Sequence, residues 1–198
     1  MASTDPVELI LASASPRRRE LLSVFGLAFT VSPARIDESR LPGEAPQVYV
    51  ARIARAKAAA VAQLNPGACV LGSDTVVVLD GEPLGKPADA AEARAMLERL
   101  SGRTHRVLTA VVLAGPGRER RELLSETRVE FAVLPEAWIE TYIASGDPFD
   151  KAGAYGIQNA AGTWVRRIDG SYSGVVGLPL FETGDLLRSA GLIDPGSD

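Results

Sequence analysis

The sequence is poor in the residues that build thiol, disulfide or soft-metal sites. Its 198 residues include one cysteine, Cys69, and one histidine, His105. One residue of each kind is too few for a Cys/His zinc site or a disulfide framework. We therefore expect Cys69, which lies in an apolar run, to be a small core residue, and we favour a structural role for His105. Any bound metal is expected to be a hard ion held by carboxylates.

Positive charge and long apolar runs are also scarce. Lys and Arg number 21 against 25 Asp and Glu, which gives a formal net charge of -4. This balance offers no broad basic surface for nucleic acid, so a bound anion must be met locally. The longest uncharged stretch, residues 58–73, contains Asn65-Pro66-Gly67, and neither a signal peptide nor a membrane span can be recognised. We expect a cytoplasmic protein without nucleic-acid or membrane partners.

Two common signatures are missing, and a third is only approximated. The sequence contains neither G-x-G-x-x-G nor G-x-S-x-G, which excludes the usual dinucleotide fingerprint and the serine hydrolase elbow. The segment 81–87 resembles a phosphate-binding P-loop but is one residue short and ends in Pro87 instead of Ser or Thr. Lys86 in this segment can still contact phosphate from the end of a hairpin.

What is present indicates one substantial core. Apolar residues make up 46% of the chain and charged residues 23%. The patterns predict helices and strands that alternate, with hairpins inserted, which favours an α/β fold with a mixed sheet. Gly72-Ser73-Asp74 is expected to end a strand, and residues 194–198 to form a disordered tail. Strands are predicted over 7–11, 28–31, 68–71, 75–79, 105–113 and 123–131, and helices over 16–25, 46–63, 89–100, 135–145 and 180–190.

The segment from Ser13 to Arg18 combines helix-start and anion-binding features. Ser15 suits an N-cap and Pro16 the first helical position. The free N–H groups there, together with Arg17 and Arg18, can form a phosphate site. The alternative is a capped surface helix with solvated arginines, and helix rules alone do not separate the two.

Lys57 and two carboxylates are the next candidates. Lys57 lies within the apolar stripe that runs from Val50 to Val61, so it either snorkels along the core edge or points into a site that needs a cation. Asp74 follows an apolar strand, where α/β sheets often place ligand-binding groups, although it can equally be a turn residue. Glu38 adds a carboxylate from a polar loop. Carboxylates brought together bind Mg²⁺ or Mn²⁺ through a few oxygens.

Late in the chain, residues 150–158 combine glycines, charges, a tyrosine and an amide. Glycines at this density allow the backbone to approach a ligand closely, and a similar run occupies residues 174–180. Gln158 can read a base edge through its paired donor and acceptor, or it can make an ordinary polar loop contact.

Together these segments resemble the Maf family of nucleoside triphosphate pyrophosphatases, in its dTTP/UTP branch, over residues 9–192. A related branch that acts on 7-methyl-GTP has a different late motif, whereas this chain has the run from Asp150 to Gln158 in full. The matching pieces are Ser13 to Arg18, Asp37-Glu38, Lys57, Ser73 to Val77, Lys86-Pro87, Ser101-Gly102 with His105 and Thr109, Asp150 to Gln158, and Val175 to Leu180.

The resemblance implies an elongated mixed sheet with flanking helices, similar to ITPases, in a single domain over 1–198 whose two lobes surround a central cleft. It also implies a homodimer that hydrolyses dTTP and UTP, with modified nucleotides as further candidates, to the monophosphate and pyrophosphate with a divalent cation, Mg²⁺ or Mn²⁺. Asp74 would be the proton acceptor and Glu38 an acidic site residue, both of them metal ligands. The phosphate-binding positions are Ser15, Arg17, Arg18, Lys57 and Lys86, and the positions for substrate choice are Arg17, Thr75 and Gln158.

Three positions depart from the family pattern. Asn159 stands where glycine is usual, Gly174 stands where asparagine is common, and Asp147 lies in a Ser-Gly-Asp-Pro segment that replaces a Gly-Glu-Pro lead-in. These changes can alter loop geometry near the base but leave the phosphate and carboxylate positions intact. A second function remains open, since the family is associated with septum formation: a non-catalytic regulator of cell division that acts by binding a partner.

Overall fold

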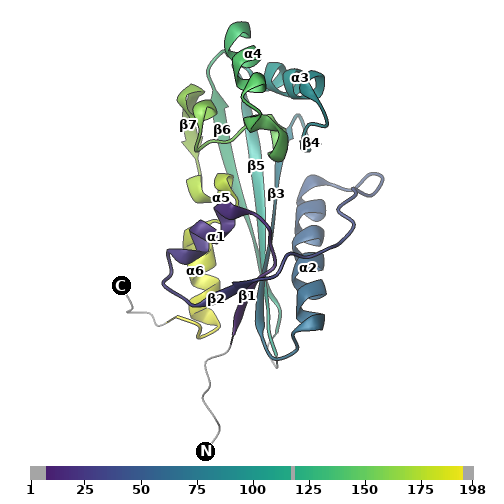
Figure 1. Cartoon of the computed structure of the whole chain (residues 1–198), viewed down its shortest axis with the longest axis vertical. Helices are drawn as coiled ribbons and strands as arrows, with labels where there is room; N and C mark the ends of the chain where they lie inside the picture. The colour runs from purple at the N-terminus through teal and green to yellow at the C-terminus, as the bar shows by residue number, and fades with distance from the viewer. Residues whose placement is uncertain (1–7, 117–118, 194–198) are drawn as a thin grey trace, which may run out of the picture.

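Three long strands organise the molecule. The computed structural model describes residues 8–116 and 119–193, so the tail expected over 194–198 lies outside the described residues. Runs of Val, Leu and Thr form neighbouring antiparallel strands of eleven residues each. They run along the long axis of the molecule (Figure 1). These strands are β3 (Cys69–Leu79), β5 (Thr104–Ala114) and β6 (Arg121–Phe131).

Short strands complete a seven-stranded sheet in the order β2-β1-β3-β5-β6-β7, with β4 paired to β3 outside this path. The β1 strand is parallel to both β2 and β3, whereas the other pairs are antiparallel. The mixed sheet inferred from the sequence is therefore confirmed. The short strands are β1 (Leu9–Leu11), β2 (Phe29–Val31), β4 (Glu82–Leu84) and β7 (Val165–Asp169).

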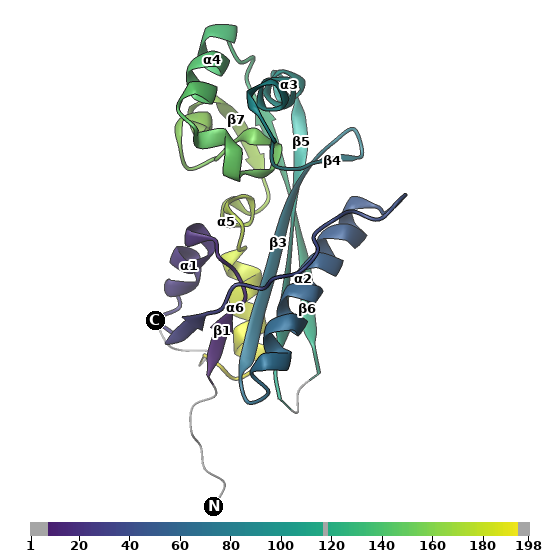
Figure 2. The same cartoon turned by 45° about the vertical axis from the view of Figure 1, so that its right-hand side comes forward.

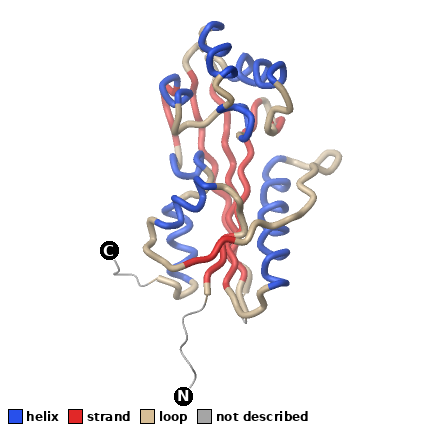
Figure 3. Tube along the Cα trace, viewed as in Figure 1, coloured by secondary structure: helices blue, strands red, loops and turns tan. Residues whose placement is uncertain are grey.

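Helices gather at both ends of the long strands (Figures 1 and 3). In Figure 2, α2 lies on one side of β3, and α1 and α6 lie on the other. The helices α3 and α4 cover the opposite end of the sheet. None of the helices in the described ranges is long and apolar enough to cross a membrane. The helices are α1 (Pro16–Ser23), α2 (Pro46–Leu64), α3 (Ala90–Leu100), α4 (Glu136–Ala144), α5 (Tyr172–Val176) and α6 (Leu180–Ser189), and short 3-10 helices are η1 (Asp147–Asp150), η2 (Ala152–Ala154) and η3 (Ala160–Trp164).

The strand end expected at Gly72-Ser73-Asp74 is wrong. β3 continues through these residues and pairs with β5 from Val70 to Val78. Gly72 is there for close packing: a Cβ at this position would lie 2.6 Å from the carbonyl oxygen of Ala54 in α2. Asp74 therefore lies in the middle of a buried strand and not at its end.

The alternation of side chains along β3 divides the core into separate clusters. Val70, Val76 and Val78 pack on the side of α2. On the other face, Cys69 and Leu71 join the cluster that contains residues of α1 and α6, whereas Val77 and Leu79 join the cluster of α3 and α4. Two polar residues of this second face, Ser73 and Thr75, separate those clusters.

His105 lies in the core, as expected from its isolation in the sequence. It is 2% exposed, and its Nε2 is 2.7 Å from the Tyr155 hydroxyl. The Phe131 and Tyr155 rings each lie 5.3 Å from the imidazole, centroid to centroid. Because this burial disfavours the charged ring, the pKa of His105 falls to about 4.

We predict that His105 makes the protein less stable in weak acid. The unfolded chain takes up a proton near pH 6.5, whereas the folded chain does so near pH 4, so protonation between these values favours unfolding. The free energy of unfolding should fall by about 2 kcal/mol from pH 7 to pH 5. Urea unfolding at both pH values measures this difference. His105→Gln removes the titrating group and should flatten the pH dependence; an equally steep fall in the variant would contradict the assignment.

Candidate active site

The site lies where one edge of β3 lacks a neighbouring strand. On that edge, β1 pairs with residues 69–71 and β4 pairs with residues 77–79. Over residues 72–76, no strand among those the structure describes pairs with it. A cavity of about 1040 Å³ opens there. A cavity of this size is large enough for a nucleotide-sized ligand.

The cavity brings together all of the site residues expected from the sequence. They come from six separate parts of the chain: the start of α1, the loop before α2, α2 itself, β3, the loop after β4 and the loop after η2. The expected residues that line the cavity are Ser15, Arg17, Arg18, Glu38, Lys57, Asp74, Thr75, Lys86 and Gln158.

The start of α1 has the geometry expected of an anion site. Ser15 is the N-cap and its hydroxyl accepts from the Arg18 N–H, while Pro16 occupies the first turn. The first N–H groups of a helix lack partners within the helix and carry partial positive charge. Arg17, also in this turn, pairs with Asp150 at 3.2 Å and is partly exposed. The end of the helix that faces the cavity is therefore electropositive.

Arg18 is anchored in the cleft, so the alternative of a solvated arginine is wrong for this residue. Its Nε donates to the Gly177 carbonyl at 2.9 Å, and its Nη2 donates to Thr75 Oγ1 at 3.0 Å. Burial lowers the pKa of the guanidinium, and the nearby Asp74 carboxylate opposes this shift. Gly177 has φ +129°, and a Cβ there would lie 3.3 Å from Arg18 Nε, so glycine suits both the backbone and the contact.

The hydroxyls of Thr75 and Thr109 form a hydrogen-bonded chain that holds Arg18. The hydroxyls of Thr75 and Thr109 are 3.0 Å apart, and Thr109 donates to the Gly174 carbonyl at 2.7 Å. Since Thr109 uses its hydrogen on Gly174, Thr75 donates to Thr109 and accepts from Arg18. Gly174, one of the departures noted in the sequence, thus contributes its carbonyl to this support, while its neighbours Val175 and Val176 line the cavity.

Two carboxylates meet the ammonium of Lys57 on the other side of the cleft. Lys57 Nζ donates to Asp74 Oδ1 at 2.8 Å and to Glu38 Oε2 at 2.9 Å. Lys57 and Asp74 are 8% and 7% exposed, whereas Glu38 lies in an exposed loop. Lys57 therefore does not snorkel along the core edge: its ammonium points into the cavity. Asp37 does not line the cavity: its carboxylate accepts from the Ser39 N–H at 2.8 Å, and hydrogen bonding to Ser39 lowers its pKa.

The carboxylates fit a magnesium-type ion better than a preformed metal cage. No group of three or more His, Cys, Asp or Glu side chains positioned for a metal occurs within residues 8–116 and 119–193. Mg²⁺ commonly binds one or two carboxylates and completes its shell with water and substrate phosphates. Glu38 and Asp74 converge on one ammonium and supply such a pair of ligands.

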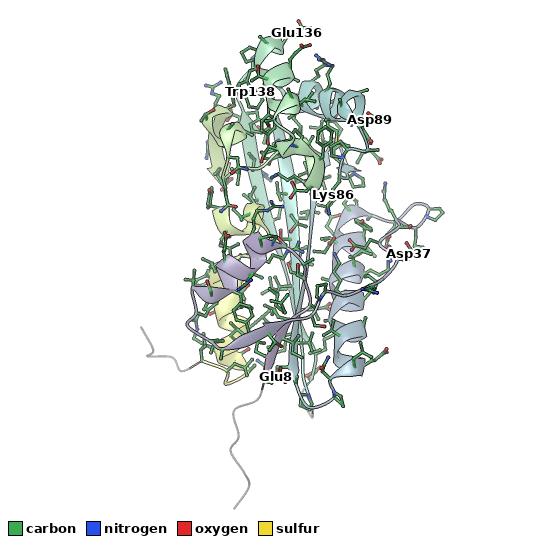
Figure 4. The ribbon with its side chains drawn as sticks, in the orientation of Figure 1. Glu8, Asp37, Lys86, Asp89, Glu136 and Trp138 are labelled. Atoms are coloured by element: carbon green, nitrogen blue, oxygen red, sulfur yellow. The ribbon has the colours of Figure 1, made fainter. Side chains whose placement is uncertain are left out.

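Lys86 and Gln158 lie on loops that line the cavity. Lys86 follows β4 and lies between the upper and lower groups of helices (Figure 4). Gln158 follows η2, and both side chains are exposed in the structure. A cation and an amide are therefore accessible to a ligand in the cavity.

Tyr49 and Arg40 are among the cavity-lining residues that sequence reasoning missed. The Tyr49 hydroxyl donates to the Glu38 carbonyl at 3.0 Å, and burial raises the pKa of this tyrosine. Arg40 pairs with Glu82 at 3.2 Å, and Arg40 lines the cavity. Tyr49 lies in α2 two turns before Lys57, so helical spacing could have found it, whereas Arg40 lies in an irregular loop that offered no such signal.

The arrangement suits hydrolysis of a polyanion. Cations at α1, α2 and the β4 loop can neutralise phosphate charge in a partly water-excluded cleft, where such contacts are stronger than in bulk water. The nearby Asp74 carboxylate can accept a proton from water. The cationic residues that line the cavity are Arg17, Arg18, Arg40, Lys57, Lys86 and Lys151, and the acidic ones are Glu20, Glu38, Asp74 and Asp150.

Comparison with known proteins agrees with this geometry. The chain is 55% identical over 190 residues to the dTTP/UTP pyrophosphatase of Myxococcus xanthus (strain DK1622), covering 96% of each chain. It is 54% identical over 186 residues to the dTTP/UTP pyrophosphatase of Anaeromyxobacter dehalogenans (strain 2CP-1 / ATCC BAA-258), covering 92% of this chain and 94% of that protein.

A solved structure has the same fold. The HAM1 protein from Coxiella burnetii superposes with a TM-score of 0.52 at 19% identity, over 92% of this chain and 99% of that chain. The expected likeness to this α/β fold is therefore confirmed. The family profile described as Maf-like protein matches residues 8–190. The chain belongs to the Maf-like protein family.

Proposed function

We propose that this protein hydrolyses dTTP and UTP to the nucleoside monophosphate and pyrophosphate. The observation that carries the proposal is the meeting of a capped, arginine-bearing helix start with the Lys57, Asp74 and Glu38 cluster in one cavity. Relatives at more than half identity that carry the name dTTP/UTP pyrophosphatase support it.

The cations of the cleft bind the triphosphate. Ser15 and the first turn of α1 present N–H groups, and Arg17 and Arg18 add guanidinium donors suited to phosphate oxygens. Lys57 and Lys86 approach from the other walls. Their charges stabilise the negative charge that builds on the leaving pyrophosphate.

Asp74 is the proton acceptor. As the oxygen of a water molecule bonds to the α-phosphorus, Asp74 takes its proton and the bond from that phosphorus to the bridging oxygen of pyrophosphate breaks. Lys57 Nζ donates to Asp74 Oδ1 at 2.8 Å and holds this carboxylate in place. Glu38 shares the same ammonium and keeps it oriented.

Glu38 and Asp74 are also the side chains that would hold Mg²⁺ or Mn²⁺. Such an ion supplies charge neutralisation and orientation of the phosphates when bound. Arg17, Thr75 and Gln158 set the choice of base: the Gln158 amide has the acceptor and donor needed for the N3–H and O4 edge shared by thymine and uracil.

We place this activity in the cytoplasm, where nucleoside triphosphates are found, and expect a homodimer without nucleic-acid or membrane partners. The competing function is partner binding in cell division without catalysis. A polar cleft with a charged triad on its wall serves catalysis and has no evident use in a pure adaptor. Release of pyrophosphate by the purified protein separates the two functions.

The substrate preference is the most direct test of the proposal. In a panel of nucleoside triphosphates with Mg²⁺ or Mn²⁺, dTTP and UTP should give the highest kcat/KM, with dCTP and CTP about ten- to hundredfold lower because a mismatched buried polar pair costs about 1–3 kcal/mol. Pyrophosphate release measures this. Preference for 7-methyl-GTP or ITP, or no turnover with any nucleotide, would contradict the proposal.

Replacing the proton acceptor should abolish turnover while the fold remains. Asp74→Asn keeps the size of the side chain but removes its charge, and loss of a general base typically lowers the rate by about 10²–10⁴-fold. Asp37→Asn is the matched control, because Asp37 lies one residue from Glu38 but outside the cavity. Near-normal kcat in Asp74→Asn would place the base elsewhere.

Removing Arg18 should weaken binding of the phosphates and spare the base. We expect Arg18→Ala to lower affinity for a non-hydrolysable dTTP analogue at least about tenfold, given the strength of charged hydrogen bonds, with little change for thymidine. Calorimetry measures both affinities. Arg19→Ala, an exposed neighbour in α1, is the control. Equal loss for nucleotide and nucleoside would show a role in folding and not in phosphate binding.

A further inference from the structure

A polar network lies beside the turn that carries Gln158, and the proposed function gives it no role. Its centre is Lys151, whose side chain is 9% exposed. Lys151 Nζ donates to the Asp147 carbonyl at 2.6 Å, to Asp147 Oδ1 at 3.1 Å and to Asp150 Oδ1 at 2.6 Å. Both carboxylates have lowered pKa values, to which the hydrogen bond from Lys151 contributes against the opposing effect of burial.

Asp147 is linked by hydrogen bonds to both ends of the turn over residues 156–159, directly at one end and through Tyr142 at the other. At one end, Asn159 Nδ2 donates to Asp147 Oδ1 at 2.6 Å. At the other end, the Gly156 N–H donates to the Tyr142 hydroxyl at 3.1 Å, and that hydroxyl donates to Asp147 Oδ2. The turn itself is closed by the Asn159 N–H on the Gly156 carbonyl at 3.1 Å. Gln158 is therefore held between two anchors that share one carboxylate.

Close packing also supports the turn over residues 156–159. A Cβ on Gly156 would lie 2.6 Å from Lys151 Cε, so the lysine stem fills the space next to the glycine. The Tyr142 ring stacks on Trp138 with 4.8 Å between centroids and 13° between planes. Packing therefore restrains Lys151 and Tyr142, whereas a side chain that contacts only solvent has no such restraint.

The two ends of the direct bond are both positions at which the sequence departs from the family pattern. Asn159 replaces glycine, and Asp147 replaces the glutamate of the usual lead-in. A glycine at 159 has no side-chain donor, so this bond depends on the asparagine. In this chain, Asn159 supplies the donor and Asp147 the acceptor of a 2.6 Å contact.

We propose that Asn159 is a specificity-determining positioning residue, which holds the Gln158 amide at the base through its bond to Asp147. This inference rests on the proposed function, in which Gln158 reads the pyrimidine edge. A misplaced amide discriminates less between bases that differ in the order of their donors and acceptors. Loss of the anchor should therefore reduce the discrimination between bases more than it reduces turnover.

The test compares Asn159→Ala and Asn159→Asp with Thr163→Ala. Thr163 lies in the following 3-10 helix, and its hydroxyl bonds locally to the Ala160 carbonyl. Asn159→Ala should lower the ratio of kcat/KM for dTTP over dCTP about five- to tenfold, mainly through a higher KM for dTTP. Asn159→Asp places a carboxylate against Asp147 and should lower the ratio at least as much. Thr163→Ala should leave it unchanged.

Hydrogen exchange of the ligand-free protein gives a readout that does not depend on activity. In Asn159→Ala, the amides of residues 156–159 should exchange at least about tenfold faster, while β3 and β5 stay protected. An unchanged dTTP/dCTP ratio in both Asn159 variants, or unchanged exchange in the turn, would overturn the inference. If the unmodified protein hydrolyses neither dTTP nor UTP, the proposed function fails, and the exchange data alone then decide whether Asn159 anchors the turn.

Discussion

The site depends on one constraint of the sheet: the middle of β3 is hydrogen bonded to a strand on one edge only. β5 pairs with β3 from Val70 to Val78, which keeps residues 72–76 extended, while β1 and β4 pair with the other edge at residues 69–71 and 77–79. Polar side chains of this stretch can therefore meet groups from α1, α2 and the late loops. The apolar clusters packed on the two ends of β3 hold this strand in position.

The charges at this edge are arranged for chemistry more than for stability. A largely buried ion pair such as Lys57 with Asp74 loses hydration that its attraction only partly returns, and apolar residues of similar volume often serve stability as well. Each buried charge nonetheless has a partner: Arg18 contacts Gly177 and Thr75, and Lys57 contacts two carboxylates. The result is a preorganised set of donors and acceptors that needs little rearrangement to receive phosphate.

Local patterns in the sequence predicted α1, α2, α3, α4 and α6, the strands of the β5–β6 hairpin and the mixed sheet, because capping residues and apolar periodicity act over short distances. They did not predict α5 or the 3-10 helices. These patterns fail at Gly72, where they predict the end of a strand although the glycine is required by close packing against α2. Residue patterns alone singled out Arg18, Lys57 and Asp74 but left each with two interpretations, and the resemblance assigned their roles. Contacts such as Tyr49 with Glu38 or Asn159 with Asp147 depend on how distant loops meet, and no single-sequence rule specifies that.

In the proposed function, the open edge of β3 receives the triphosphate between α1 and Lys57, with the base at the Gln158 turn. The decisive measurement is a crystal structure with a non-hydrolysable dTTP analogue and Mg²⁺. We expect phosphate oxygens within hydrogen-bond distance of Arg18 and the first turn of α1, the α-phosphorus near Asp74, and the thymine edge facing the Gln158 amide. An analogue bound in the reverse orientation, or outside the cavity, would contradict it.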